Sequence, residues 1–98
     1  MAIMVDELRR WPGKGVPGVF GGEHLSCHLT TDGALEELHL FAERIGMRRA
    51  WFQPRSTPHY DLTPRGRELA LREGAVFVPA RTQAKVRMAL KKTLALSS

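Results

Sequence analysis

Short apolar runs alternate with longer segments of helical periodicity along this 98-residue chain. Apolar runs of four to six residues that end at Gly, Pro or charged residues are typical of buried strands. Four such runs predict strands, at residues 2–5, 27–30, 48–53 and 75–78.

Between and after these runs, apolar residues recur at three- and four-residue spacing, which predicts three amphipathic helices. They lie at residues 34–46, 63–73 and 82–94. Asp32 is the predicted N-cap of the first helix. The second helix opens on Thr63, whose hydroxyl can cap it, followed by Pro64, which fits a first helical turn.

The order of these elements predicts an α/β fold. The order helix, glycine, strand, proline occurs twice along the chain, with Gly46 and Gly74 as the glycines. Such alternation favours consecutive β-α-β units with parallel strands. We therefore expect a small single-domain protein with a mostly parallel four-stranded sheet and three helices. Residues 12–24, rich in Gly and Pro, predict a surface flap.

The net charge of +5 divides the chain into two parts. Residues 1–80 hold ten basic and ten acidic side chains, whereas residues 81–98 hold five basic side chains and no acidic one. We predict an α/β core over residues 1–80 and an appended basic helix over 81–98 with a frayed end. The cations of this helix predicted to contact nucleic acid are Lys85, Arg87, Lys91 and Lys92.

The composition, 43% hydrophobic and 26% charged, is that of a globular protein. No apolar run approaches the ~18 residues of a membrane span, so we expect a cytoplasmic protein with no membrane partner. The single cysteine, Cys27, excludes an internal disulfide and a cysteine-cluster zinc site. Cys27 precedes His28, but adjacent strand residues point to opposite faces, which argues against a thiol nucleophile activated by that histidine.

Polar side chains follow each predicted strand, where open α/β sheets bind ligands. His28, His59 and Asp61 are the predicted catalytic residues, because imidazole near neutral pH can serve as a general base that a carboxylate orients. His28 and His59, with a carboxylate such as Asp6 or Asp61, match the ligand types of a divalent-metal site, and Asp6, His28 and His59 are the predicted metal ligands. The predicted substrate contacts are Arg9, Arg10, Trp11, Gln53, Tyr60 and Arg81.

Two other interpretations compete with this site. His28 can be a buried, hydrogen-bonded strand histidine, while Asp61 and Thr63 cap the second helix. Residues 13–18 match the pattern G-x-G-x-x-G of dinucleotide-binding proteins, but no amphipathic helix follows them and Pro17 interrupts the motif. We therefore interpret residues 13–18 as part of the flap.

Several short motifs form an ordered set over residues 3–78. They are Val5-Asp6-Glu7-Leu8-Arg9, Ser26-Cys27-His28-Leu29-Thr30-Thr31-Asp32, Leu35-Glu36-Glu37-Leu38-His39-Leu40-Phe41-Ala42, Trp51-Phe52-Gln53 and His59-Tyr60-Asp61-Leu62-Thr63. In this order they resemble the small bacterial family called domain of unknown function 4031. The resemblance implies a bacterial or phage-type intracellular domain and supplies no reaction. Its matching positions include Asp6, Arg9, His28, Asp32, Gln53, His59, Tyr60 and Asp61.

The candidate residues favour a domain that recognises phosphate or nucleotide. Within that class they favour a metal-dependent phosphoesterase acting on nucleic acid, with arginines holding phosphate oxygens and a divalent metal ion as cofactor. The alternative is a non-catalytic module that binds nucleic acid or another protein. A homodimer would then form through exposed Leu40 or the apolar stripe of the last helix. The sequence does not decide whether the protein is an enzyme.

Overall fold

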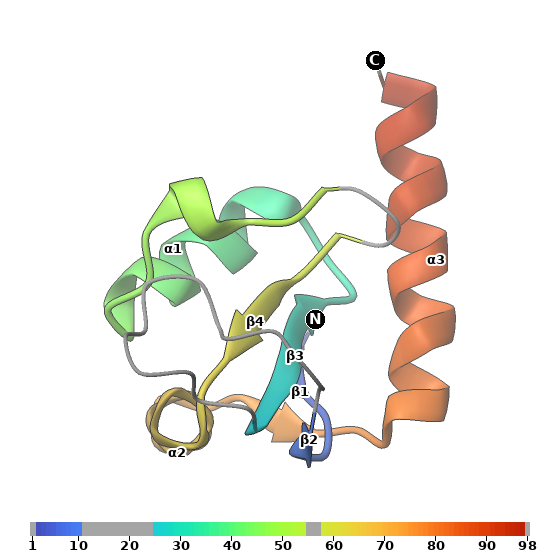
Figure 1. The fold of residues 1–98 in the computed structure, drawn as a ribbon. Coiled ribbons are helices and arrows are strands. Elements are labelled where there is room, and N and C mark those ends of the chain that lie inside the picture. The colour runs from blue at the N-terminus through green and yellow to red at the C-terminus, as the bar shows by residue number, and fades with distance from the viewer. Residues whose placement is uncertain (1, 11–24, 55–57, 98) are drawn as a thin grey trace.

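The computed structural model describes residues 2–10, 25–54 and 58–97, with side chains through residue 92 (Figure 1). The strands are β1 (Ile3–Val5), β2 (Arg9–Arg10), β3 (Leu25–Thr31), β4 (Tyr60–Leu62) and β5 (Val76–Phe77). The helices are α1 (Leu35–Arg44), the short 3-10 helix η1 (Arg49–Trp51), α2 (Pro64–Arg72) and α3 (Ala80–Ser97). The predicted flap over residues 12–24 lies outside the described residues.

Strand β3 is the centre of a mixed sheet. It pairs antiparallel with β1, β2 and β4, whereas β1 pairs parallel with β5. The expectation of a mostly parallel four-stranded sheet is therefore wrong. Parallel neighbours need a long crossover, usually a helix, and the described residues between β1 and β3 include no helix.

The strand predicted over residues 48–53 is also wrong. The chain forms η1 there, and within the range only Gln53 makes a strand-like contact, an isolated bridge to His59. After α1 the chain turns at Gly46, whose φ of 90° is a conformation that other residues rarely adopt. Trp51 and Phe52 then pack against the core without strand pairing.

Strand β4 lies between the predicted strand over residues 48–53 and the predicted helix over residues 63–73, where the sequence predicts no strand. Tyr60 and Leu62 are buried, and Asp61 between them points to the other face of the sheet. This alternation over three residues is the period of a strand. An alternation of only three residues is too short to identify a strand from the sequence.

The N-terminal ends of α1 and α2 show which of the capping residues predicted from the sequence cap a helix. Thr63 accepts a hydrogen bond from Gly66 N at 3.0 Å, and Pro64 opens α2, as predicted. The prediction for α1 is wrong, because its N-cap is Ala34 without a side-chain bond. Asp32 instead accepts a hydrogen bond from Ala2 N at 2.7 Å, which ties the loop to the start of β1.

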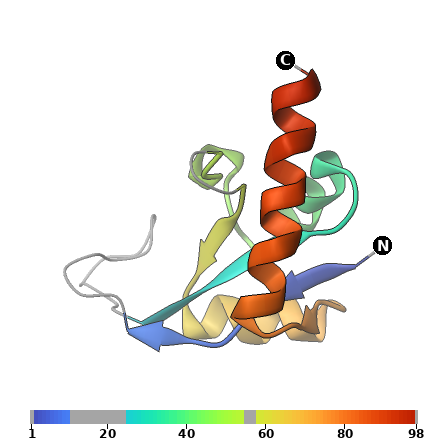
Figure 2. The same ribbon diagram turned by 90° about the vertical axis from the view of Figure 1, so that its right-hand side faces the viewer.

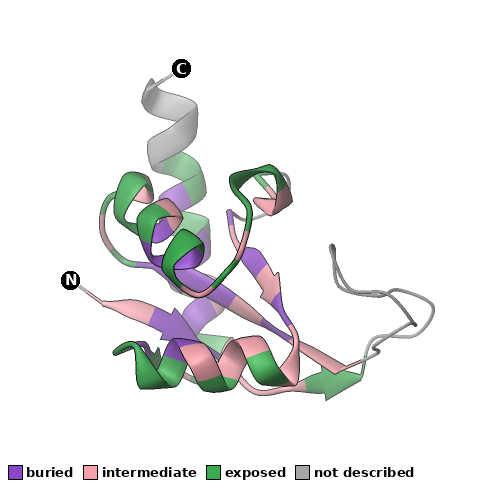
Figure 3. Cartoon of the chain, turned by 90° about the vertical axis from the view of Figure 1, so that its left-hand side faces the viewer, coloured by how far each residue is buried: buried purple, intermediate pink, exposed green. Residues whose placement is uncertain are grey.

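The sheet lies between two helical layers. Figures 2 and 3, taken from opposite sides, show α1 and α2 covering one face and α3 crossing the other. The hydrophobic core lies under α1 and α2 and includes Leu29, Leu38, Tyr60 and Leu62, each fully buried. The α3 face is more polar, because β3 and β4 place His28 and Asp61 there, directly opposite each other.

Helix α3 is longer than predicted at both ends, and its C-terminal part extends beyond the sheet (Figure 2). Gln83, Arg87 and Leu90 are buried. The division of the chain at residue 80 and the frayed end stay predictions. Among the described residues no helix has both the length and the hydrophobicity to cross a membrane.

Leu40 is exposed on α1, as its place opposite the apolar stripe indicated, with 54% of its surface accessible. A homodimer through Leu40 or α3 stays a prediction. The cytoplasmic location and the bacterial origin also stay predictions.

Replacing Thr63 should show how much the α2 cap stabilises the fold. We expect Thr63→Ala to lower the free energy of unfolding by about 1 kcal/mol, because Gly66 N loses its acceptor. Urea unfolding measures the change. Thr63→Ser, which keeps the oxygen, is the control and should stay close to wild type. Equal destabilisation by both variants would contradict a capping role.

Candidate functional site

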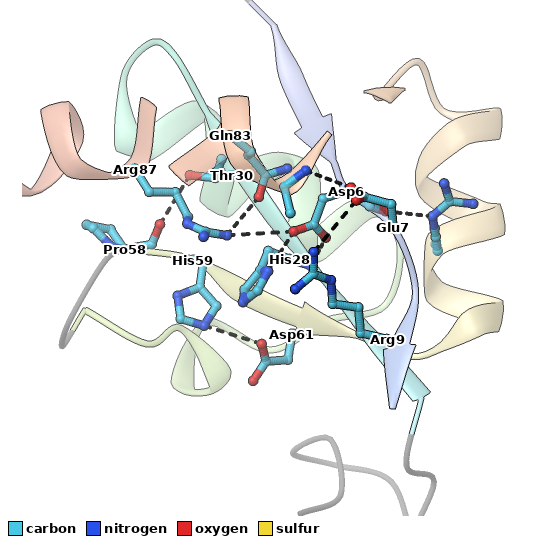
Figure 4. A network of polar contacts seen from close by, with 12 residues as sticks. Asp6, Glu7, Arg9, His28, Thr30, Pro58, His59, Asp61, Gln83 and Arg87 are labelled. Carbon is cyan, nitrogen blue, oxygen red and sulfur yellow. Dashed lines mark hydrogen bonds and ion pairs between the residues drawn. The ribbon is translucent and has the colours of Figure 1, made fainter. Parts of the chain in front are cut away.

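Two histidines and one aspartate converge on the α3 face of the sheet (Figure 4). His28 lies on β3 directly opposite Asp61 on β4. His59 precedes Asp61 by two residues, so both side chains point to the same face. The His28 and His59 rings meet edge to face with centroids 4.9 Å apart. We call His28, His59 and Asp61 the triad.

The backbone around His59 is fixed by a small antiparallel bridge. Gln53 N donates to His59 O at 2.9 Å, and His59 N donates to Gln53 O at 3.1 Å. The Gln53 side-chain amide also donates to Asp61 Oδ2. Gln53, a predicted substrate contact, therefore holds a triad member in position.

Asp6 supports the triad through hydrogen bonds to His28. It follows β1 and accepts hydrogen bonds from His28 N at 2.6 Å on Oδ1 and from His28 Nδ1 at 2.7 Å on Oδ2. This contact fixes the ring orientation, so a metal ion held by His28 in this orientation would bind through Nε2. Asp6 was a predicted metal ligand. Its carboxylate hydrogen-bonds to His28, and Asp61 supplies the carboxylate of the triad.

The four side chains differ in their access to solvent. His28, His59 and Asp61 expose 19%, 11% and 25% of their side-chain surface, whereas Asp6 exposes 3%. The triad can therefore meet a ligand, and Asp6 is a buried support.

The pKa of Asp61 is lower than its ordinary value. Burial alone would raise this pKa, but His59 Nε2, 3.3 Å from Asp61 Oδ1, and the Gln53 amide favour the carboxylate and lower it. Asp61 is thus held as an anion next to two imidazole rings. This is the charge state that metal ligation or the orientation of a general base needs.

The triad has the donor types of a divalent-cation site. One ligand atom from each residue can be chosen so that all three lie within 4.8 Å of one another. Ligand atoms around one such ion lie roughly 3–4 Å apart, because each metal–ligand distance is ~2.1 Å. Small rotations of the side chains would bring the three ligand atoms to this spacing. A carboxylate behind a ligating histidine, as Asp6 stands behind His28, is the usual outer support of such sites.

Helix α3 brings a buried guanidinium to the same network. Arg87 NH1 lies 3.9 Å from Asp6 Oδ2 and donates to Gln83 Oε1 at 2.9 Å. Arg87 was predicted to contact nucleic acid together with the lysines of this helix, but only 8% of its surface is exposed, because this side of α3 packs on the sheet. Contact of Arg87 with nucleic acid stays a prediction. Lys85, Lys91 and Lys92 are exposed, as expected.

The predicted substrate contacts are scattered. Arg9 pairs with Ser26 in the β2–β3 ladder, so it shares the face of His28, and Arg10 points to the opposite face. Arg81 is exposed in the first turn of α3. Trp11 lies outside the described residues.

Tyr60 does not join the triad. Its ring is buried in the core, and its hydroxyl lies 2.7 Å from His39 Nδ1. Burial raises the pKa of Tyr60 and lowers the pKa of His39, so desolvation favours the neutral form of both groups.

Cys27 is buried on the core face, opposite to His28. Burial and the nearby Asp6 raise the pKa of its thiol to about 12. A thiol with this pKa is not a nucleophile at neutral pH, in agreement with the sequence-based expectation.

Sequence reasoning missed two residues of the network. Gln83 was assigned no role, and Arg67 of α2 donates from Nε to the Asp6 carbonyl oxygen at 2.9 Å. A signal existed for α3: Gln83, Arg87 and Leu90 follow a spacing of four and three residues, which places them on one side of a helix.

In a comparison with family models the chain matches the family described as Protein of unknown function (DUF4031) over residues 3–90. This range contains the triad, Asp6, Gln83 and Arg87. Comparison with curated proteins and with solved structures gives no match.

Replacing Asp61 should give a stability loss that depends on pH. Because the folded state lowers the pKa of Asp61, its ionised form stabilises the fold above about pH 4, and this contribution is lost as the pH falls through the lowered value. Asp61→Asn should therefore reduce the free energy of unfolding at about pH 6, with a deficit that shrinks toward about pH 2. Urea unfolding at stepped pH measures it.

The matched control is Glu68→Gln, at an exposed position of α2. Glu68→Gln should change the free energy of unfolding at about pH 6 by less than about 0.5 kcal/mol, as is usual for surface substitutions. A deficit of Asp61→Asn that is constant from about pH 6 to pH 2 would contradict the assigned electrostatics.

Proposed function

The chain belongs to the family Protein of unknown function (DUF4031), and from the geometry of its triad we propose that it is a divalent-metal-dependent phosphoesterase acting on nucleic acid. One observation carries the proposal. His28, His59 and Asp61 come from two paired segments, and their ligand atoms gather within 4.8 Å. Two imidazoles and one carboxylate make a set of ligands that leaves open positions on an ion for substrate and water.

The charge distribution supports phosphate as the substrate group. Arg9 shares the face of the triad, and Arg87 reaches the same network from α3. Lys91 follows Arg87 by one helical turn and is exposed, so positive charge continues from the site along α3. Arginine and lysine are the side chains that bind phosphate oxygens most favourably.

The residues define a simple hydrolytic step. A bound ion would supply a water molecule of lowered pKa and would polarise a phosphoryl oxygen. Hydrolysis then forms one bond from the water oxygen to phosphorus, breaks the bond from phosphorus to the leaving oxygen, and transfers one water proton to that leaving oxygen. The triad holds the ion, and Asp6 keeps the His28 ring in the ligating orientation.

Metal titration tests the proposal. We expect wild-type protein to bind one Zn²⁺ or Mn²⁺ per chain in isothermal titration calorimetry. His28→Ala, His59→Ala and Asp61→Asn should each weaken binding by at least about tenfold, and Asp6→Asn by about 10–100-fold through loss of the outer support. His39→Gln, a histidine replacement away from the triad, should leave binding unchanged.

The same variants test catalysis. Wild-type protein with metal should cleave a labelled single-stranded oligonucleotide, and EDTA or Asp61→Asn should abolish the cleavage. Metal binding that triad substitutions do not affect, or metal binding without cleavage of any phosphodiester, would contradict the proposed activity.

A second candidate is a non-catalytic module that docks α3 on nucleic acid. It is favoured by the three exposed lysines of α3, Lys85, Lys91 and Lys92, on a helix that extends beyond the sheet (Figure 2). Charge contacts of this kind give affinity that falls with salt and does not depend on sequence.

Salt-dependent binding tests this candidate. For a single-stranded oligonucleotide, each lysine–phosphate contact adds about 0.7 to the slope of log affinity against log salt concentration. Replacing all three lysines by alanine should therefore lower the slope by about 2, as measured by fluorescence anisotropy. The control with equal net charge replaces the exposed arginines Arg48, Arg65 and Arg72. Equal slopes in the two triple variants would contradict docking through α3.

A further inference from the structure

Helix α3 contributes two buried polar side chains to the edge of the triad. Gln83 is fully buried, and Arg87 keeps 8% of its surface exposed. Arg87 NH1 donates to Gln83 Oε1 at 2.9 Å, so the two side chains form a fixed unit on one face of the helix. Figure 4 shows this unit beside His59 and facing Asp6.

Two donors of this unit lack a hydrogen-bond partner among the described residues. They are Gln83 Nε2 and Arg87 Nε, both buried. Folded proteins satisfy nearly all buried donors, and an unsatisfied one points to a water, an ion or a ligand at that place. Here two such donors occur on adjacent side chains.

The nearest carboxylate does not satisfy the guanidinium. Arg87 NH1 lies 3.9 Å from Asp6 Oδ2, beyond hydrogen-bond distance, and that oxygen already accepts the His28 Nδ1 bond. Burial lowers the pKa of Arg87, against the opposing effect of Asp6 and Asp61. A buried cation with an unpaired Nε is suited to an anion with several acceptor oxygens.

We infer that Gln83 and Arg87 form the phosphate-binding side of the triad site, so that the phosphoryl group of the substrate lies between the triad and α3. This inference rests on the proposed phosphoesterase function. Arg87 Nε belongs to the edge of the guanidinium that binds phosphate through two parallel hydrogen bonds, and Gln83 Nε2 adds a donor beside it. Arg87 retains 10% of its side-chain surface exposed, so it is not sealed from solvent.

In this assignment one side of α3 lines the site, and the polar side chains of α3 have two different roles. Gln83 and Arg87 face the triad, whereas Lys85, Lys91 and Lys92 face solvent. The cations of α3 therefore do not act as one group. Arg87 recognises the phosphate at the reacting centre, and the lysines contact the remainder of a nucleic-acid strand.

Titration with inorganic phosphate tests the inference, with and without saturating Mn²⁺, by isothermal titration calorimetry. Wild-type protein should bind phosphate. Arg87→Gln should weaken phosphate binding by at least about tenfold, and Gln83→Leu should weaken it less. Both variants should bind Mn²⁺ with wild-type affinity. Lys85→Gln, an exposed position on the same helix, should change neither affinity.

Arg87→Lys keeps the inference testable if Arg87→Gln does not fold. Lysine preserves a positive charge beside Asp6 but lacks the two-pronged guanidinium edge, so phosphate binding should weaken while Mn²⁺ binding stays unchanged. Wild-type phosphate affinity in either folded Arg87 variant would overturn the inference. Parallel loss of Mn²⁺ and phosphate binding would also overturn it, because Arg87 would then act only by positioning Asp6 and His28.

The two proposals fail in different ways. If wild-type protein binds no divalent ion, the phosphoesterase fails, and Arg87-dependent binding of phosphate to the metal-free protein still supports the anion site. If Mn²⁺ binds through the triad but phosphate does not bind, the anion site fails and the metal site stands.

Discussion

Asp6 connects the sheet to the helices on both of its faces. Its two carboxylate oxygens accept hydrogen bonds from the backbone and the ring of His28, its main-chain carbonyl oxygen accepts one from Arg67 of α2, and Arg87 of α3 lies 3.9 Å from its carboxylate. A carboxylate withdrawn from water is tolerated only where it is paired and hydrogen-bonded. Asp6 therefore fixes the approach of β1, β3, α2 and α3 to one point, and that point adjoins the triad.

The antiparallel ladder then determines which residues meet at this point. The register of β3 with β4 places His28 opposite Asp61, and the alternation of strand side chains brings His59 to the same face. A shift of β4 by one residue in this register would turn His59 and Asp61 toward the core and expose Tyr60 and Leu62. The hydrophobic residues under α1 and α2 thus hold the register that the polar face requires. Packing on one face and chemistry on the other depend on the same strand pairing.

The sequence predicted features that local chemistry determines and failed where distant segments decide. Thr63 and Pro64 start α2 as predicted, because a cap needs only its own turn. The parallel sheet was wrong, because strand direction depends on which segments pair. His28, His59 and Asp61 were expected together at the carboxyl ends of parallel strands, but neighbouring antiparallel segments bring them together. Charge alone also did not show that Arg87 is buried, because its helical spacing from buried Leu90 places it on the packed side of α3.

The central claim is that the triad binds a divalent metal ion. Anomalous X-ray diffraction from crystals grown with Zn²⁺, recorded on both sides of the zinc absorption edge, tests it most directly. The account predicts an anomalous peak about 2.1 Å from one nitrogen each of His28 and His59 and from an Asp61 oxygen, with Asp6 still bonded to His28 Nδ1. No peak at the triad, or a zinc ion bound by Asp6 in place of Asp61, would contradict it.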